Sequence, residues 1–552
     1  MQAYERKKGD NMRRKILFII PPYFNVEDFL NPKNSSMLPT FAIPYGVLSL
    51  ESYLKANTTK GVTIELLDLQ IEAYKIVKNN PNTSNINKGL MAIVSKKLQY
   101  PVDIVGISAI FNSSYEYLEE LTIAIKKAHT PPLCVVGGGL ASNLYQSVLN
   151  DFLLIDGVCF AEGEIPLLDL IDSDDFHRLL NEHRSWITKK TVREGKTPEP
   201  SYVENLDDIP MFDYRLIDLN NYHGWSPFTQ HCNQSNKSEL SIHTSRGCPF
   251  NCVFCASSSV HGKQIRYMSE RRVISEVDYM IKDFDMNVLT IEDDLFLSNK
   301  KRAMRILSEF SKRKIRIELP NGIAVYAIDD EIGRLLKEAG VTKVQLAVES
   351  CSDYVLKEII NKPHKVSQVR KAKDILQKHG ILVHAYIVIG LPGEMDEHRK
   401  ESLEIIKEIG FDWVSFAIAI PIAGSRLYKI CVENNYLVEK TFKNHVMSKG
   451  SIKAPGVNPR DIEKTAYLMN LDVNFVNNVN VASGFFDRAL PYFVHIAGRY
   501  PKHAFAQYVL ANIYKKINEN DLAKIHRDAF IDIINKDMEW KSYADKFDLL
   551  RS

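Results

Sequence analysis

The stretch Leu240-Ser-Ile-His-Thr-Ser-Arg-Gly-Cys-Pro-Phe-Asn-Cys-Val-Phe-Cys255 joins a short apolar segment to three closely spaced cysteines. Cys248, Cys252 and Cys255 follow the spacing C-x3-C-x2-C. Iron–sulfur clusters and structural zinc ions usually take four protein ligands, so three cysteines leave one metal position open. An open position on an iron–sulfur cluster can bind a small molecule and pass it an electron. The alternative is a zinc site, with His261 as its fourth ligand.

The sequence after the cysteines alternates short apolar runs with amphipathic segments. Strands are predicted at residues 240–244, 288–291, 315–319, 343–348, 383–389 and 414–418, with helices such as 270–284, 329–339, 366–378 and 397–409 between them. Six such units predict a partial (β/α)6 barrel of parallel strands with helices outside. The cysteine loop follows the first strand, on the carboxyl rim where barrel enzymes place their chemistry.

Distinctive motifs follow the later strands of this predicted barrel. Glu292-Asp293-Asp294 follows the second strand, Glu349-Ser350 ends the fourth, and Ile389-Gly-Leu-Pro-Gly-Glu394 closes the fifth. Pro421-Ile-Ala-Gly-Ser-Arg-Leu-Tyr428 follows the sixth. Taken singly, the acidic and serine-containing motifs are equally typical of helix caps and solvated turns.

The cysteine loop and these rim motifs resemble the radical S-adenosylmethionine (SAM) enzymes. The resemblance implies a 4Fe-4S cluster on the three cysteines, with SAM bound to its fourth iron and cleaved to a 5′-deoxyadenosyl radical. It also implies SAM-binding roles for Phe254, Asp293, Glu349, Ser350 and Gly390. Lys362 either pairs with the SAM carboxylate or is an ordinary surface lysine.

Residues 13–190 read as a separate α/β domain. Predicted strands at 15–20, 62–68, 104–108, 133–137 and 157–160 are apolar throughout, and predicted helices at 45–55, 115–127 and 165–170 separate them. Such strands indicate a doubly wound, Rossmann-like parallel sheet, which binds ligands at the carboxyl ends of its strands. The motifs at those ends resemble the cobalamin-binding domain that precedes many radical SAM domains. The resemblance implies cobalamin-binding roles for Tyr23, Ser108, Gly137, Gly138, Gly139, Glu162 and Gly163.

The D-x-H-x-x-G motif, whose histidine ligates cobalt in methionine-synthase-type domains, is missing from the sequence, and His129 and His177 lack its context. The domain is therefore expected to hold cobalamin without that histidine, or to have lost the cofactor.

Residues 191–239 read as a linker, 240–436 as the barrel, and 437–552 as a helical domain. A tetratricopeptide-like register in the helical domain places Ala489 and Ala523 at equivalent positions. We expect this domain to cover the mouth of the barrel; a generic helical hairpin fits the pattern equally well.

The composition of the sequence bears on whether the protein binds nucleic acid or a membrane and on where it is located. A net charge of +2 gives no argument for nucleic acid or an anionic membrane, and no apolar run is long enough to span a bilayer. Eight cysteines without a paired framework favour reduced thiols and a cytoplasmic location.

The resemblance implies a cobalamin-dependent radical SAM methyltransferase acting on an unactivated carbon, or phosphorus, of a specialised metabolite or peptide. Methylcobalamin would carry the methyl group, and an external flavodoxin- or ferredoxin-like reductant would supply the electron. One alternative is a non-methylating radical SAM enzyme that cyclises, contracts a ring or oxidises, with or without cobalamin. Tyr326, Tyr386 and Cys351 are candidate hydrogen donors in that case, or packing residues. The other alternative is a non-catalytic protein with a structural metal.

Overall fold

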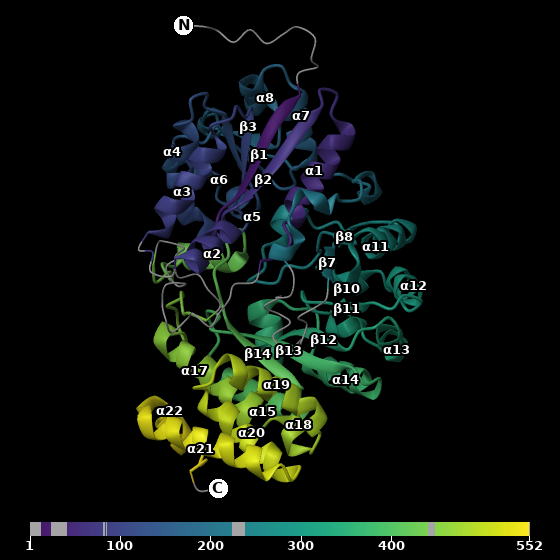
Figure 1. Ribbon diagram of the computed structural model, residues 1–552, viewed down its shortest axis with the longest axis vertical. Helices are drawn as coiled ribbons and strands as arrows, with labels where there is room; N and C mark the ends of the chain where they lie inside the picture. Colours follow the sequence, from purple (N-terminus) through teal and green to yellow (C-terminus); the bar gives the residue numbers. More distant parts are fainter. Residues whose placement is uncertain are drawn as a thin grey trace.

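The computed structural model describes residues 13–23, 41–80, 83, 85–222, 238–439 and 448–550. The chain forms three parts stacked along the long axis of the molecule: an N-terminal α/β domain, a central half-barrel and a C-terminal group of helices (Figure 1). The predicted α/β architecture with a helical C-terminal domain is confirmed. In the described residues, no helix combines the length and apolar character that a membrane span requires.

The N-terminal domain is built on a six-stranded sheet of order β2-β1-β3-β4-β5-β6. Its strands are β1 (Arg14–Ile20), β2 (Val62–Asp68), β3 (Ile104–Ser108), β4 (Leu133–Gly137), β5 (Gly157–Cys159) and β6 (Trp186–Ile187). The first five are parallel, and β6 is an antiparallel edge strand that the sequence did not predict. Separate hydrophobic clusters bury the two faces of the sheet: Ile16 and Phe18 point to one, Leu17 and Ile19 to the other.

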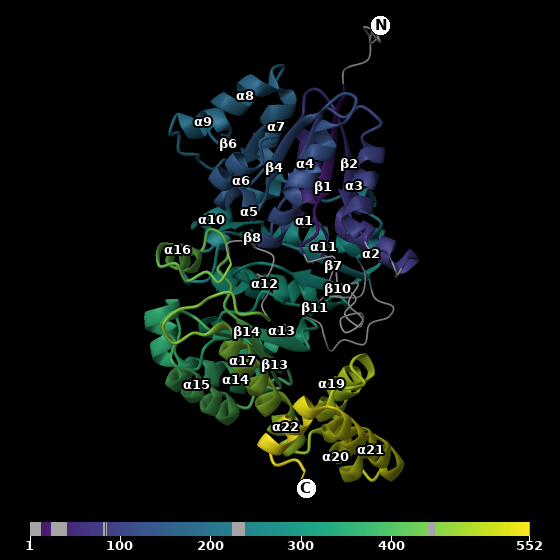
Figure 2. The same ribbon diagram turned by 90° about the vertical axis from the view of Figure 1, so that its left-hand side faces the viewer.

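Helices cover both faces of this sheet (Figure 2). They are α1 (Tyr45–Asn57), α2 (Leu69–Asn79), α3 (Ile86–Lys97), α4 (Leu118–Lys126), α5 (Gly139–Asn143), α6 (Tyr145–Asp151), α7 (Glu164–Asp172), α8 (Phe176–Glu182) and α9 (Lys189–Arg193). The helix predicted at 115–127 starts only at Leu118, because Asn112–Tyr117 forms a 3-10 helix first.

The linker between the two α/β parts packs on the half-barrel. Three 3-10 turns, Leu206–Asp208, Tyr214–Leu216 and Leu219–Asn221, are each capped by the side chain of the preceding Asn or Asp. Buried Phe212 and Tyr214 belong to the hydrophobic core of the half-barrel. The linker therefore lies over one of the two domains that it joins.

The half-barrel has six parallel strands in two three-stranded sheets, of order β11-β10-β7 and β12-β13-β14. Its strands are β7 (Ser238–Ile242), β10 (Met286–Ile291), β11 (Arg316–Glu318), β12 (Lys343–Glu349), β13 (Leu382–Ile389) and β14 (Trp413–Ile418). Its helices are α10 (Ser257–His261), α11 (Glu270–Phe284), α12 (Lys300–Phe310), α13 (Asp330–Glu338), α14 (Val366–Lys378), α15 (Asp396–Ile409) and α16 (Arg426–Glu433), with a π-helix at Val355–Ile360. Isolated parallel bridges join the two sheets, for example between Ile323 and Leu346.

The strands of the half-barrel alternate in polarity. Every second residue, such as Leu240, Leu289 and Val344, packs in the core under the helices. The residues between them are largely polar and face the other side, the lumen: they include Glu239, Ser241, Thr290, Glu318, Gln345, His384, Tyr386 and Ser415. The lumen is therefore a polar surface, unlike either face of the N-terminal sheet.

The C-terminal domain contains α17 (Pro459–Leu471), a π-helix (Asp472–Val476), α18 (Val479–Ala482), α19 (Phe486–Arg499), α20 (Ala504–Lys516), α21 (Asn520–Lys536) and α22 (Met538–Lys546). Tyr492 of α19 stacks on Trp413, the first residue of β14, and its hydroxyl bonds to His384 near the start of β13 (2.8 Å). The expectation that this domain covers the barrel mouth was wrong for α19, which packs against the base of the strands. Ile462 of α17 does approach the rim, where it lies beside Gly390, and the segment before α17 reaches it too, since Gly393 donates to the carbonyl of Pro455 at 3.4 Å.

Candidate active site

The cysteine loop is closed at its base by a short hairpin that the sequence did not predict. Strand β8 (Ser245–Arg246) pairs antiparallel with β9 (Arg266–Tyr267), and the three cysteines lie between them. Gly247 turns the chain with φ +102°, where a Cβ would stand 2.3 Å from the carbonyl oxygen of Gln264. Only glycine fits this turn. The backbone N–H of Cys248 donates to the carbonyl of Gly262 at 3.1 Å, which holds the loop shut.

The three thiols lie close enough to influence one another. The pKa of Cys255 is raised to about 11, mainly by burial and to a smaller extent by the nearby Asp294, Cys252 and Cys248. Burial also raises the pKa of Cys252, whereas the ammonium of Lys362 lowers it. Among the described residues, no group of three or more His, Cys, Asp or Glu side chains is placed to hold a single metal ion.

The two aspartates of the acidic motif after β10 have different hydrogen-bond partners. Buried Asp293 accepts hydrogen bonds from the Thr244 N–H (2.5 Å), the Thr244 hydroxyl (2.6 Å) and the Ser245 hydroxyl (2.6 Å). Asp293 therefore braces the strand that leads into the cysteine loop. Asp294 instead accepts a hydrogen bond from Ser257, and its charge raises the pKa of Cys255. Sequence reasoning chose Asp293, but Asp294 lies nearer the thiols.

Two predicted SAM-binding residues end β12 in a strained turn. Glu349 has φ +66°, a conformation that non-glycine residues rarely adopt. Its carboxylate accepts a hydrogen bond from Lys362 at 2.9 Å. Burial lowers the pKa of Lys362, but Glu349 and Cys252 outweigh it and the net shift is upward. Ser350 is buried, and its hydroxyl accepts from the Ser352 N–H at 3.1 Å.

The turn after β13 is held by its own glutamate. The N–H of Gly390 (φ +84°) donates to the carboxylate of buried Glu394 at 2.6 Å. Burial raises the pKa of Glu394 to about 7. Phe254 is half-buried and packs with apolar residues beside the cysteine loop.

The carboxyl edge of the N-terminal sheet meets the cysteine loop. Helix α5, which starts at Gly139 after β4, contacts α10 of the loop, and a Cβ at Gly139 would lie 3.7 Å from Val260. Ser108 ends β3 on the same edge, and Gly138 passes so close to Ala109 that a Cβ would lie 2.5 Å from its carbonyl oxygen. The two predicted cofactor edges are thus in direct contact.

Apolar side chains remain exposed on this edge. Ile110 and Phe111, just after β3, are 51% and 53% exposed. The ring of Tyr23 lies 5.0 Å from that of Phe111. Exposed apolar groups beside a glycine-rich turn suit a large, flat and mostly apolar ligand.

Comparisons with known proteins agree with this geometry. The B12 binding domain model matches residues 38–171, and the Radical SAM superfamily model matches residues 242–418. The chain is a radical SAM enzyme with a B12-binding domain.

Individual relatives of this radical SAM enzyme are distant. It is 26% identical, over 79% of its length and 87% of the relative's, to the cytidylyl-2-hydroxyethylphosphonate methyltransferase of Streptomyces wedmorensis. It is also 26% identical, over 59% of its length and 58% of the relative's, to the anaerobic magnesium-protoporphyrin IX monomethyl ester cyclase of Rubrivivax gelatinosus. The fold matches the cobalamin-dependent SAM radical enzyme OxsB, solved with aqua-cobalamin and SAM bound, with a TM-score of 0.61 at 15% identity, over 97% of this chain and 80% of that one.

Glu162 of the B12-binding domain, which the sequence motif predicted to bind the corrin, contacts the stem of the cysteine loop. Its carboxylate is buried against the hairpin of the cysteine loop, 3.1 Å from Arg246, 2.6 Å from Arg266 and 2.8 Å from His261. Burial raises its pKa, but Arg246 and His261 together hold the pKa well below the usual value. The neighbouring Gly163 packs against Leu50 in the same domain.

His261, the fourth ligand of the zinc alternative, is turned toward this network: its Nδ1 lies 2.8 Å from a carboxylate oxygen of Glu162. Sequence reasoning missed Arg246 and Arg266. The available signal was a charged residue two positions before Cys248, inside a segment otherwise read as strand and loop.

The three candidate hydrogen donors of the radical SAM enzyme differ in how exposed their side chains are. Tyr326 is partly exposed and lies close enough to Cys248 and Cys252 for both to raise its pKa, after burial. Tyr386 donates to the carbonyl of Pro320 at 3.1 Å. Cys351 is fully buried, which suits packing and not hydrogen transfer.

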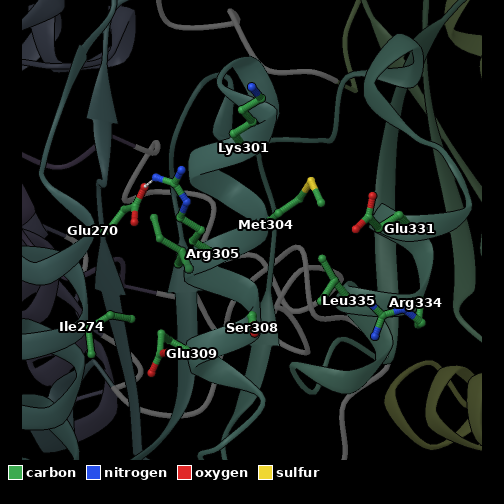
Figure 3. A pocket seen from close by; sticks show the side chains of 11 residues that line it. Glu270, Ile274, Lys301, Met304, Arg305, Ser308, Glu309, Glu331, Arg334 and Leu335 are labelled. Carbon is green, nitrogen blue, oxygen red and sulfur yellow. Dashed lines mark hydrogen bonds and ion pairs between the residues drawn. The ribbon is translucent and has the colours of Figure 1, made fainter.

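A surface groove of about 520 Å³ lies elsewhere, among the outer sides of α11, α12 and α13 (Figure 3). An ion pair between Arg305 and Glu270 (2.9 Å) spans part of it. The groove is on the far side of the helices from the lumen, so it is not part of the active site.

Proposed function

We propose that this protein is a cobalamin-dependent radical SAM methyltransferase acting on an unactivated carbon or phosphorus centre of a small molecule or peptide. The observation that carries the proposal is the contact between the glycine-rich edge of the B12-binding domain and the cysteine loop. That contact supports a shared reaction space bordered by the two predicted cofactor edges, at the rim of the polar lumen. The relative named as a methyltransferase, which spans most of the chain, supports methylation over cyclisation.

The residues fit these cofactors. Cys248, Cys252 and Cys255 would hold the 4Fe-4S cluster. Tyr23, Ser108 and the Gly137–Gly139 turn would line the corrin. When bound, the cluster supplies the electron that cleaves SAM, and cobalamin carries the methyl group.

The remaining rim residues would orient SAM and shield the reaction space from water. Asp294 and Glu349 offer acceptors to a ligand that carries an ammonium group and ribose hydroxyls, and Asp294 is our preferred acidic residue in place of Asp293. Lys362 holds Glu349 in place. Ile110 and Phe111 exclude water from the space between the domains.

The substrate would enter the lumen next to Tyr326 and Tyr386. Ser415, in the middle of β14, is exposed, so this part of the lumen is open to a ligand. An external one-electron reductant is required, and we propose a flavodoxin- or ferredoxin-like protein in the reducing cytoplasm.

Anaerobic reconstitution with iron, sulfide and cobalamin tests the proposal. About four iron and one cobalt per chain are expected. Incubation with SAM, reductant and a candidate substrate should give both 5′-deoxyadenosine and S-adenosylhomocysteine. A Cys252→Ala variant should lose the iron and the 5′-deoxyadenosine while still binding cobalt.

Other results of that experiment contradict the proposal. 5′-Deoxyadenosine without S-adenosylhomocysteine, in a protein that holds cobalt, would indicate the non-methylating alternative. Four iron with no cobalt would rule out the cobalamin-dependent reaction. Zinc in place of iron would overturn the enzyme assignment for the cysteine loop.

A further inference from the structure

The clearest structure outside the cofactor edges is a buried charge network between the B12-binding domain and the half-barrel. The B12-binding domain contributes Glu162 from the turn after β5, Glu164 from the start of α7 and Ser49 from α1. The half-barrel contributes His261 from α10, Arg246 from β8 and Arg266 from β9. The carboxylates and guanidiniums are all less than 9% exposed. Buried charges need close partners, and each of these has one across the domain boundary.

Both arginines sit at the stem of the cysteine loop. Arg246 is the last residue of β8, and Arg266 is the first residue of β9 paired with it. Arg246 donates to Glu162 (3.1 Å) and Glu164 (2.9 Å), and Arg266 donates two bonds to Glu162 (3.0 and 2.6 Å). The carboxylate of Glu162 therefore binds both strands of the stem, β8 and β9.

The backbone of the turn is shaped to aim Glu162 at this stem. Ala161 has φ +64°, in the left-handed region that non-glycine residues rarely occupy. Its N–H donates to the hydroxyl of Ser142 at 3.0 Å, and Ser142 donates to the carbonyl of Cys159 at 3.3 Å. Backbone strain that the surrounding structure holds in place in this way is typical of functional sites.

The stem is held from the opposite side by the half-barrel itself. Arg302 of α12 donates to the carbonyls of Thr244 (2.9 Å) and Met268 (3.0 Å), which lie just before and just after the hairpin. Asp293 binds Thr244 and Ser245. The cysteine loop is thus clamped between two domains, with Glu162 as the contribution of the B12-binding domain.

We propose that Glu162 is a positioning residue that fixes the cluster-holding loop against the B12-binding domain, and not a ligand of the corrin. Partners that orient metal ligands from behind affect metal retention by about 10–100-fold when they are removed. Glu162 acts through Arg246 and Arg266 and not on a cysteine directly, but it holds both ends of the loop at once. Its loss should loosen the cluster while leaving the corrin surface intact.

The test compares Glu162→Gln with wild type after anaerobic reconstitution of both cofactors. Two quantities are measured: the rate at which a ferrous chelator removes iron, and the equilibrium affinity for hydroxocobalamin. Iron loss should be about tenfold faster in the variant, and the affinity for cobalamin unchanged. The electron paramagnetic resonance signal of the reduced cluster should broaden. Glu182→Gln, an exposed glutamate of the same domain, is the matched control and should match wild type.

A second variant distinguishes loss of the network from general unfolding of the B12-binding domain. Arg266→Gln removes the partner from the half-barrel side, so it should also speed iron loss with cobalamin affinity kept. The increase in iron loss in the double variant should be smaller than the product of the two single increases, because both changes break the Glu162–Arg266 ion pair.

Two results overturn the inference. Weaker cobalamin binding with normal iron retention in Glu162→Gln would make Glu162 a corrin contact, as its motif first indicated. Unchanged iron loss in Arg266→Gln would show that the network does not hold the loop. The inference rests on the cluster assignment but not on methylation, so wild-type iron content separates its failure from that of the proposed function.

Discussion

The N-terminal sheet and the half-barrel are both parallel sheets covered by helices, yet their strands are built differently. Strand β3 of the N-terminal sheet is buried on both faces. Strands of the half-barrel bury apolar residues under the helices and turn Glu, Gln, Thr and Ser toward the lumen, where most of these polar side chains are themselves buried. The first sheet can therefore offer a ligand only its edge, whereas the second offers a surface. That difference fits a domain that holds one large cofactor and a domain that must also hold a substrate.

The largest effect should come from placing the same charge in the two sheets. Val105→Asp, at a fully buried position of β3, should cost about 4 kcal/mol or more, because an unpaired charge is buried. Ser415→Asp, on the exposed lumen side of β14, should cost less than about 1 kcal/mol. Urea denaturation followed by circular dichroism measures both. Equal losses would show that the lumen is not an open surface.

The next largest effect is a pH dependence of stability that is expected for the C-terminal helices and not for the two sheets. Burial lowers the pKa of His503 to about 4, below the usual 6.5. Between these values the unfolded state binds the extra proton, so stability is complete above pH 6.5 and is lost as the pH falls toward 4. The loss should reach about 3 kcal/mol.

His503→Asn keeps the cap acceptor for the Ala506 N–H but cannot titrate. The variant should be less stable overall, yet its C-terminal transition should depend much less on pH in that window. A small slope should remain, because burial also lowers the pKa of His495 and His526. An undiminished slope in thermal melts between pH 4 and 7 would contradict the assignment to His503.

A smaller effect concerns the glycine turn at the corrin edge. Gly138→Ala should cost about 2 kcal/mol, since φ is +100° and the new Cβ meets the carbonyl of Ala109. Cobalamin affinity should fall with it. Gly195→Ala has a positive φ but open space around the Cβ, so it should cost only about 1 kcal/mol and leave cobalamin binding unchanged. Thermal melts and cobalamin titration distinguish the two variants.

The smallest effect should come from the outer groove. Arg305→Ala removes a largely exposed ion pair with Glu270, which is worth about 0.5 kcal/mol. Stability, cofactor content and product formation should stay near wild type. A clear loss of 5′-deoxyadenosine formation would show that the groove contributes to the reaction after all.

Much of this structure was predictable because it follows from local patterns. Strands β2, β3 and β4 and helices α11 and α14 have the bounds that apolar runs and caps predict. The β8–β9 hairpin was not predictable, because two-residue strands carry no periodicity. The same holds for β6, which pairs with β5 only through the tertiary fold.

At the site, sequence patterns located the edges but not the direction of each side chain. The cysteine loop and the Gly137–Gly139 turn are brought together as the domain order implies. Glu162 and Asp293 belong to recognised motifs, yet both point into buried networks that no spacing reveals. Which of two adjacent carboxylates faces a ligand depends on partners from other domains, such as Arg266 for Glu162.

The bond between His384 and Tyr492 joins the start of β13 to helix α19 of the C-terminal domain. Both side chains are buried, so the strand and the helix share a polar contact inside their packed interface. The same strand ends at the turn of Gly390, on the rim that carries the cysteine loop. A substitution in α19 is therefore expected to act on the site from below, through the position of a strand, without touching a cofactor or a substrate.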